Sequence, residues 1–266
     1  WLVTASLFFY SWWNPPYVIL LISSVAINFF FGRLLNRSRS KAFLILSITF
    51  NLVLLAYFKY FNFFIENAGL LFDFSYNFTH IILPLAISFF TFQQIIYLLD
   101  SYKGLTKDYG FIEYSLFVTF FPQLVAGPIL RAKEVIPQFI NRPSFSFDHI
   151  FTGLRFILFG LFLKVVMADN ISIFVDKGFM IDVENLSAID VWTLAFLFGF
   201  QIYFDFSAYS NIALGTARIL GIQFPENFNF PYMASNPRDF WKRWHISLSS
   251  WIRDYLYLPL TGAKVL

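Results

Sequence analysis

The sequence predicts an all-α protein: a polytopic membrane helical bundle with a re-entrant segment and an interfacial amphipathic helix. Composition is the first reason, since 58% of the 266 residues are hydrophobic and 13% are charged, whereas soluble domains carry about 25% charged residues. Long apolar runs and an alternation of loop charge are the other two reasons. The chain has no cysteine, which excludes disulfides, thiolate metal sites and a cysteine nucleophile within it.

Five apolar segments are long enough to cross a bilayer, which requires about 20 residues. They are the region before Gly32, Ala42–Ile65, Phe78–Leu99, Ile150–Ala168 and Val191–Ala217. The pair Pro15-Pro16 interrupts the first segment, because proline lacks an N–H donor and clashes with the preceding turn. We therefore expect one helix to end near Trp13 and the next to begin near Tyr17.

The charge of the loops orients these spans, because cytoplasmic loops carry an excess of Lys and Arg. The predicted cytoplasmic loops are Gly32–Lys41, Ser101–Gly110 and the region from Arg218 onward, and the predicted external loops are Glu66–Asn77 and Asp169–Asp190. The net charge of +3 follows from the same bias, so we expect a lipid bilayer and no nucleic acid as partner.

One uncharged segment, Tyr114–Leu130, breaks the alternation because basic residues flank it on both sides. It is short and contains Pro122 and Gly127-Pro128. A re-entrant hairpin that enters and leaves from the cytoplasmic side restores the alternation, and its non-helical backbone would have to line a cavity or be buried in protein. A kinked spanning helix is the alternative.

Asp205 lies near the middle of Val191–Ala217. A carboxylate at bilayer depth costs about 2.5–3.5 kcal/mol on insertion scales and therefore faces a polar interior. Gln201, Asp205 and Tyr209 recur at intervals of four residues and share one helix face. Two interpretations stay open: a hydrogen-bonded cluster that holds helices together, or a functional site.

The segment FWKRWHISLSSWIRDYLYLPLTG, which starts at Phe240, is too polar to span and too aromatic for an ordinary loop. Asn236-Pro237 predicts a helix start. Apolar residues then recur at helical spacing, and a second face is polar. The apolar stripe is Trp241, Trp244, Leu248, Trp251 and Tyr255, and the polar face is Lys242, His245, Ser249 and Arg253. The pattern predicts one amphipathic helix in the cytoplasmic interface.

His245 has two interpretations. It is either one more polar residue of the interface, or an acid–base or hydrogen-bonding group, because an imidazole with a pKa near 6.5 exchanges protons at neutral pH. The sequence contains no G-x-S-x-G, P-loop or H-E-x-x-H motif that would compete with it.

Several blocks together resemble the membrane-bound O-acyltransferase family, and most of all its bacterial branch of polysaccharide O-acetylation. These blocks are YFDFSAYSNIALG, ENFNFPY, DFWKRWHISLSSWIRDYLYLPL, LPLAISFFTFQQIIYLLD and FPQLVAGPILRAKEVIPQF. The resemblance runs from Phe8 to the end of the chain, and the blocks occur in the order of the family.

The resemblance implies a multi-pass enzyme of the bacterial inner membrane. Such an enzyme moves an acyl group, here acetyl, from a cytoplasmic thioester donor (acetyl-CoA or an acyl carrier) to hydroxyls of an exported polysaccharide, with no bound cofactor or metal. A periplasmic or extracellular acyltransferase is the implied protein partner. D-alanyl transfer to teichoic acid is the alternative within the family. A polytopic transporter is the alternative of another class, but the inverted repeats typical of transporters are not visible.

His245 matches the first histidine of the family's motif, and we predict His245 and Asp205 as catalytic residues. The predicted substrate- or donor-binding residues are Lys242, Arg243, Gln201, Tyr209 and Ser249. The histidine usually considered catalytic in the family lies downstream of the W-H-I-S-L-S motif and has no counterpart here. We therefore expect residues 1–266 to be a single domain, incomplete at both ends and inactive in isolation.

The loop assignment gives a direct test, because a chain without cysteine accepts single cysteine reporters cleanly. Lys133→Cys should react with a membrane-impermeant maleimide only after the cytoplasmic side is opened, and Asp182→Cys should react in intact cells. Labelling of Lys133→Cys from outside would overturn the re-entrant assignment of Tyr114–Leu130.

Overall fold

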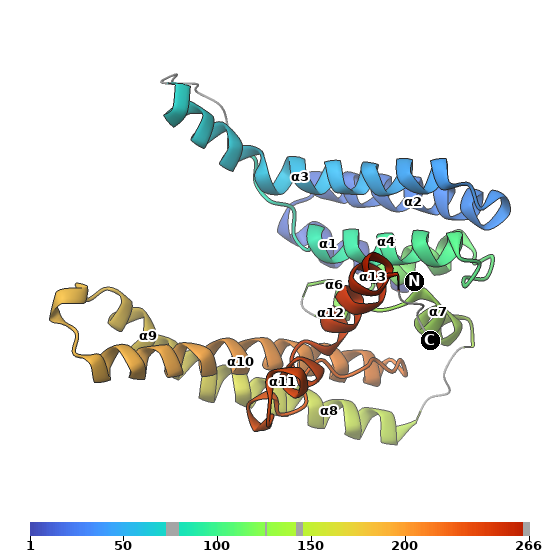
Figure 1. Cartoon of the computed structure of the whole chain (residues 1–266). Helices are drawn as coiled ribbons and strands as arrows, with labels where there is room; N and C mark the ends of the chain where they lie inside the picture. Colours follow the sequence, from blue (N-terminus) through green and yellow to red (C-terminus); the bar gives the residue numbers. More distant parts are fainter. Residues whose placement is uncertain (73–79, 126, 142–145, 263–266) are drawn as a thin grey trace. The chain divides into compact units, whose positions relative to one another are not determined.

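A computed structural model describes residues 1–72, 80–125, 127–141 and 146–262, and these residues form helices and no strand. The all-α prediction is therefore confirmed. The chain divides into two compact units, one of Trp1–Val125 with Ile129–Asn141 and one of Ala126–Pro128 with Arg142–Leu266. Figure 1 shows the helices of both units. The expectation of a single domain stays a prediction.

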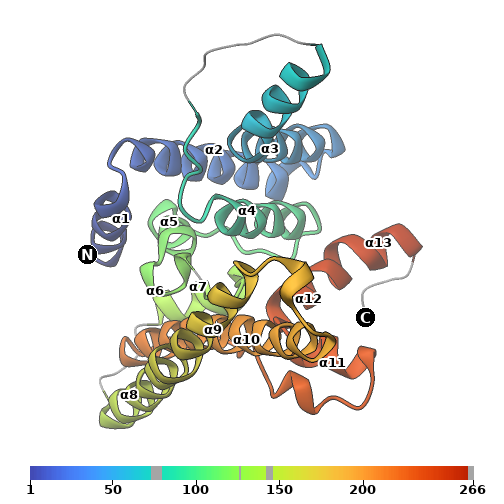
Figure 2. The same cartoon turned by 90° about the vertical axis from the view of Figure 1, so that its left-hand side faces the viewer.

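The first unit contains seven described helices. They are α1 (Leu2–Trp13), α2 (Pro16–Ser38), α3 (Lys41–Phe72), α4 (Ile87–Tyr102), α5 (Phe111–Thr119), α6 (Phe121–Leu124) and α7 (Ala132–Ile140). The break predicted at the proline pair is confirmed, since α1 ends at Trp13 and Pro16 opens α2. Helices α2 and α3 lie side by side with α4 next to them (Figures 1 and 2).

Only α2 and α3 of this unit are long and apolar enough, among the described helices, to cross a membrane. The predicted span Phe78–Leu99 is helical only from Ile87, and its first two residues lie outside the described part, as do residues 73–77 of the predicted loop Glu66–Asn77. Most side chains of α4 are buried. This helix is hydrophobic because it packs inside the unit.

A buried hydrogen-bond network joins α2, α3, α4 and α5. Asn28 and Asn51 exchange two bonds, of 3.2 and 2.6 Å between amide nitrogen and oxygen. Gln94 donates to the Ser24 hydroxyl (3.0 Å) and accepts from the Tyr114 hydroxyl (3.3 Å). Such pairs hold apolar helices together where hydrophobic contrast with lipid is absent.

The predicted re-entrant segment Tyr114–Leu130 is broken as its prolines suggest. Helix α5 ends at Thr119, Phe120 leaves the helical region with ψ of 109°, and Pro122 opens the four-residue α6. The side chains from Tyr114 to Phe120 are buried. The break at Phe120 thus lies within protein, and the path of the segment relative to a bilayer stays a prediction.

The second unit is built on two long helical rods. The first is α8 (Phe147–Leu161), the π-helical turn η1 (Phe162–Ala168) and α9 (Asp169–Phe179), and the second is α10 (Ala188–Ile219), with the short turn η2 (Val183–Asn185) before it. Both rods are long and apolar enough to span. The predicted span Ile150–Ala168 was too short, and Asp169–Phe179 of the predicted external loop is helix, because η1 continues the first rod.

Small residues let the two rods touch backbone to backbone. A Cβ atom built on Gly153 would lie 2.6 Å from the Gly215 carbonyl oxygen, and one built on Gly160 would lie 2.7 Å from the Ala208 carbonyl oxygen. From the first contact to the second, the residue number rises by seven in α8 and falls by seven in α10, so the helices are antiparallel (Figure 1). This seam, from Gly153–Gly215 to Gly160–Ala208, fixes their register.

The end of the chain forms short helices in place of the one amphipathic helix predicted. These are η3 (Pro231–Met233), α11 (Pro237–Arg243), α12 (Ile246–Trp251), η4 (Ile252–Tyr257) and α13 (Leu258–Thr261). Asn236 caps α11 as predicted, accepting from the Asp239 N–H at 2.9 Å. The helix breaks at Trp244–His245, so the predicted stripe and polar face do not lie on one continuous helix.

Substitutions at the seam should show how closely the rods must pack. Gly160→Ala and Gly215→Ala should each destabilise the protein by about 1–3 kcal/mol, because the added methyl meets backbone that cannot yield. Gly199→Ala is the matched control in α10, since its Cβ would meet only the Tyr232 hydroxyl, at 3.4 Å. Thermal unfolding in detergent measures the difference, and equal midpoints for Gly160→Ala and Gly199→Ala would contradict the seam.

Candidate active site

His245 sits at the break between α11 and α12 with a left-handed backbone, φ 40° and ψ 58°. A residue with a Cβ atom pays about 1–2 kcal/mol for this conformation. Strain of this kind persists only where the surroundings hold it in place, and it clusters at functional sites. Arg39, Ala86 and Phe230 also have a positive φ, so His245 is distinguished by the combination of this backbone with a buried imidazole.

The loop before η3 holds this conformation. The Asn227 carbonyl accepts from the Ile246 N–H (2.9 Å), and the Arg243 carbonyl accepts from the Asn229 N–H (3.0 Å). The Asn227 side-chain oxygen accepts from the Ser247 hydroxyl at 2.7 Å. These bonds on both sides of His245 form a clamp, which we define as Asn227–Asn229 against Arg243–Ser247.

Aromatic rings bury the imidazole inside this clamp. Its ring centroid lies 4.7 Å from that of Phe206, edge to face, and 6.4 Å from that of Phe228. Burial lowers the pKa of His245 to about 4, since an apolar environment disfavours the charged form. Among the described residues its Nε2 has no hydrogen-bond partner. At neutral pH the site thus holds an uncharged imidazole whose Nε2 atom is buried.

His245 opens onto a groove of about 750 Å³ that mixes aromatic and cationic side chains. The lining residues are Arg238, Trp241, Trp244, His245, Leu248, Ser249, Ile252, Arg253 and Tyr257. Arg238 and Arg253 supply positive charge to an otherwise apolar wall. Such a groove suits a ligand with an apolar or neutral part near the imidazole and an anionic part at the arginines.

The predicted donor-binding residues divide in the structure. Ser249 lines the groove and donates its hydroxyl to the Trp244 carbonyl at 3.1 Å. Arg243 is engaged by Asp239 at 3.0 Å, which also lowers the pKa of that carboxyl. Lys242 is exposed and does not line the groove. The groove thus brings Arg238 to His245 in place of Lys242 and Arg243.

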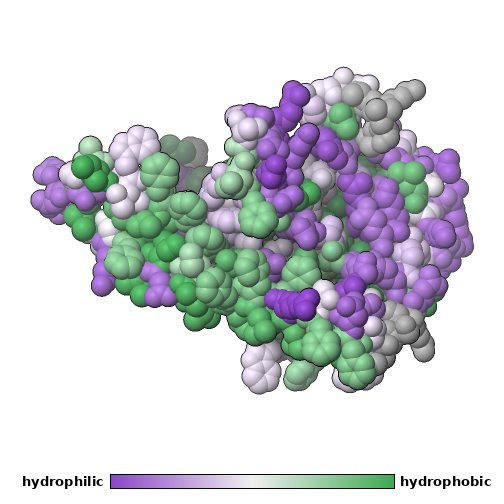
Figure 3. Space-filling view, turned by 90° about the horizontal axis from the view of Figure 1, so that it is seen from below, coloured by the Kyte–Doolittle hydropathy of each residue, from purple (hydrophilic) through white to green (hydrophobic). Residues whose placement is uncertain are grey.

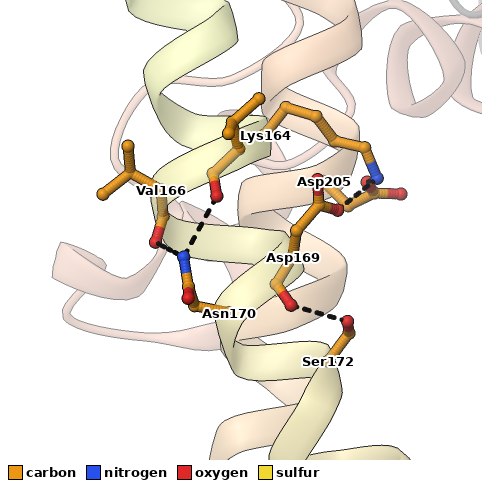
Figure 4. Close-up of polar contacts among 7 residues, drawn as sticks. Lys164, Val166, Asp169, Asn170, Ser172 and Asp205 are labelled. Carbon is orange, nitrogen blue, oxygen red and sulfur yellow. Dashed lines mark hydrogen bonds and ion pairs between the residues drawn. The ribbon is translucent and has the colours of Figure 1, made fainter.

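Asp205 and His245 are not brought together. Phe206 and Tyr203 of α10 contact His245 and Trp244, and at 100° per residue Asp205 points away from both. Instead Asp205 accepts from Lys164 Nζ at 2.7 Å (Figure 4). The two residues predicted to be catalytic therefore serve different faces of α10.

Of the two residues predicted to share a helix face with Asp205, Tyr209 lies near Lys164, the partner of Asp205, and in the described part of the chain no contact of Gln201 with this pair is recorded. Tyr209 shares the surroundings of Asp205 as expected, because Lys164 Nζ lies 5.5 Å from the centre of the Tyr209 ring. The side-chain oxygen of Gln201 is buried and has no hydrogen-bond partner among the described residues. Asp169 also pairs with Lys164, at 2.8 Å. We call Lys164, Asp169 and Asp205 the charged cluster.

The π-helical turn brings Lys164 and Asp169 onto one side. In an α-helix residues five apart are about 140° apart around the axis. In η1 the Asp169 N–H bonds to the Lys164 carbonyl, five residues back, so the side chains rise one above the other. Asn170 donates to the carbonyls of Val165 (3.1 Å) and Val166 (2.9 Å), as Figure 4 shows.

A second cavity, of about 330 Å³, lies between α8, α10 and the clamp loop. Phenylalanine side chains form much of its wall, and Ser207, Ser210, Asn211, Glu226 and Asn227 are its polar lining. Ser210 Oγ and Asn227 Nδ2 are buried and, within the described part of the chain, have no partner. This cavity gives α10 a polar neighbourhood at Ser207, Ser210 and Asn211, but Asp205, for which a polar interior was predicted, does not line it.

Comparison with known proteins decides the family. Residues 100–266 match the membrane-bound O-acyltransferase family. A peptidoglycan O-acetyltransferase of Helicobacter pylori is 42% identical, with 100% of this chain and 56% of the relative covered. The chain belongs to the membrane-bound O-acyltransferase family. A probable alginate O-acetylase of Pseudomonas aeruginosa is 38% identical, covering 99% of this chain and 52% of the relative.

Teichoic acid D-alanyltransferase of Bacillus subtilis is a further relative, 33% identical over 65% of this chain and 45% of its own length. The chain thus spans about half the length of the curated relatives it matches. Members of this family are membrane proteins, and the four described helices long enough to span agree with that.

Sequence reasoning missed three residues of this family member. Lys164 interrupts an apolar run in FLKVVMADN and could have been found as a lysine inside a span. Asn227 and Arg238 gave no such signal, because their roles depend on the clamp and on the helix break.

The buried imidazole makes a prediction about pH. Because burial lowers the pKa of His245 in the folded protein, the unfolded chain binds a proton on this histidine at a higher pH than the folded chain does. The stability that His245 contributes is therefore full above pH 6.5 and is lost as the pH falls towards 4. NMR titration should show His245 neutral at pH 5.5. His245→Gln should flatten the fall in stability between pH 6.5 and 4, and an imidazole that titrates near 6.5 would contradict the buried site.

Proposed function

We propose that the protein carrying this chain is an O-acyltransferase of the bacterial inner membrane. It would move an acetyl group from a cytoplasmic thioester donor to a hydroxyl of an exported polysaccharide. One observation carries the proposal: relatives named for acetyl transfer to peptidoglycan and alginate match essentially the whole chain at 42% and 38% identity. The D-alanyltransferase matches 65% of it, which makes teichoic acid the less favoured acceptor.

The reaction is an acyl exchange. The acceptor oxygen forms a bond to the thioester carbonyl carbon, the carbon–sulfur bond breaks, and the hydroxyl proton ends on the departing thiol. The protein must therefore hold the carbonyl, stabilise its developing negative charge and move one proton. No bound cofactor or metal is needed for this chemistry.

The groove offers a place for the donor. Both acetyl-CoA and an acyl carrier present the thioester on a phosphate-bearing arm, and Arg238 and Arg253 are the groove's cationic residues. Arg253 also pairs with Asp254 at 2.7 Å, so we assign Arg238 the larger share of phosphate binding. The carbonyl would then lie against His245 at the inner end.

His245 is better suited to hydrogen bonding than to proton abstraction. A base with a pKa of about 4 gives little driving force for removing a hydroxyl proton at pH 7. With the proton on Nε2 it can donate to the carbonyl oxygen as charge develops there. We propose this polarising role for His245 and leave the general base to another residue of the full protein.

A periplasmic or extracellular acyltransferase partner would supply the acceptor hydroxyl of this exchange and pass the acetyl group on to a glycan hydroxyl outside the membrane. This partner, the donor and the glycan are parts of the proposal. The cytoplasmic opening of the groove follows from the predicted location of the region after Arg218.

Acetyl transfer to polysaccharide by the protein that contains this chain tests the proposal. His245→Gln should lower kcat about 10- to 1,000-fold yet leave the pH optimum unchanged, because glutamine donates a hydrogen bond without titrating. Arg238→Gln should raise KM for the donor several-fold, and Lys242→Gln, outside the groove, is the matched control. Loss of all activity in His245→Gln with intact donor binding would make His245 the base. Transfer of D-alanyl but not acetyl would overturn the acetyl assignment.

A further inference from the structure

The charged cluster lies at the middle of both long rods. Lys164 is 17 residues from the start and 15 from the end of the span Phe147–Phe179, and Asp205 is 17 and 14 residues from the ends of Ala188–Ile219. It also continues the glycine seam, four residues beyond Gly160 on one rod and three beyond Ala208 on the other. If the rods cross the bilayer, the cluster lies near its midplane.

Within the described residues the cluster is not electrically balanced. Lys164 is the one cation recorded with Asp169 and Asp205, so two carboxylates share a single ammonium group. Their side chains are also open on one side: Lys164 is 28% exposed, Asp169 50% and Asp205 41%. Charges in this position cannot face hydrocarbon without a cost of several kcal/mol.

The surface around the cluster is apolar and has the shape of a helix stripe. Phe198, Ile202 and Tyr209 flank Asp205 at intervals of three and four residues along α10, and each is between 41% and 44% exposed. Val165, next to Lys164, is 57% exposed. In the view from below, Figure 3 shows hydrophobic side chains gathered on one side of the surface and hydrophilic ones on the other.

We propose that this face docks a membrane-spanning helix of a second polypeptide, apolar along its length and carrying one basic side chain at mid-depth. The apolar stripe would pack against the incoming helix, and the basic side chain would enter between Asp169 and Asp205. The cluster then contains two cations and two anions. Arginine fits best, because its planar fork can bond both carboxylates at once.

The arrangement gives selectivity as well as contact. A wholly apolar helix would leave the two carboxylates unmatched, and an acidic one would add a third negative charge. Charged residues within spans pair with one another for this reason. Lys164 has a separate task, since it keeps both carboxylates oriented towards the same opening.

The test uses synthetic helices in proteoliposomes that contain the full protein. Leucine–alanine helices of about 24 residues, with Arg, Leu or Glu at the centre, carry an acceptor dye for energy transfer from a labelled protein. The Arg helix should bind about three- to twentyfold more tightly than the Leu helix, and the Glu helix more weakly than either.

Variants assign the effect to the cluster. Asp169→Asn, which leaves the Lys164–Asp205 pair intact, should halve the Arg preference or more, and Asp169→Asn with Asp205→Asn should abolish it. Asp182→Asn, an acid outside both rods, should leave it unchanged. Equal affinity of the Leu helix for wild type and variants shows that the fold is kept. Equal binding of the Arg and Leu helices to wild type, or no binding of any helix because the protein's own polypeptide covers the face, would overturn the proposal.

Discussion

Close contact between α8 and α10 is the constraint on which the second unit depends. Glycine at 153, 160 and 215 lets the backbones meet, and that contact fixes the register of one rod against the other. Register in turn decides which side chains face each other further along. Lys164 reaches Asp205, and the cavity beside Ser210 opens between the rods, because the seam leaves no freedom to slide.

The face of α10 that lies away from α8 contacts the clamp. Tyr203 and Phe206 form the floor on which the clamp closes, so His245 is buried by residues of a helix far from it in sequence. The site is thus assembled from a rigid rod and a strained loop. Rigid rods position groups well, while a strained residue in a clamp resists repacking.

The sequence indicated the helical class and the helices α3 and α10, because length and apolarity determine them. The proline pair indicated the break between α1 and α2. The sequence predicted one continuous helix after Asn236, where the structure has several short ones. Trp241, Trp244 and Leu248 do recur at helical spacing, but the hydrogen bonds of Asn227 to Ile246 and Ser247 stabilise a break that no periodicity contains. Within the predicted span Phe78–Leu99 the described helix begins only at Ile87, and its apolar composition is no guide to its place, because a helix buried among others is as apolar as one that spans. Asp205 was recognised as polar at depth, but its partner Lys164 was missed although it interrupts an apolar run. The contact between Lys164 and Asp169 could not be predicted, since the π-turn that turns Asp169 towards Lys164 leaves no mark in residue spacing.

That π-turn lets the rod contain one residue more than a continuous α-helix without losing the charged cluster. A π-turn accommodates one residue more than the α-helical turn it replaces. Loss of one residue between Lys164 and Asp169 would let the rod become continuous α-helix and would place the two side chains four residues apart, about 40° around the axis, so that the pair and the direction of α9 are kept. A change of the π-turn to α-helix without a deletion would instead place them about 140° apart and turn Asp169 away from Lys164. Natural sequences that lack one residue in this stretch should therefore keep the cluster, and an alignment that places a one-residue gap there joins proteins with the same pairing.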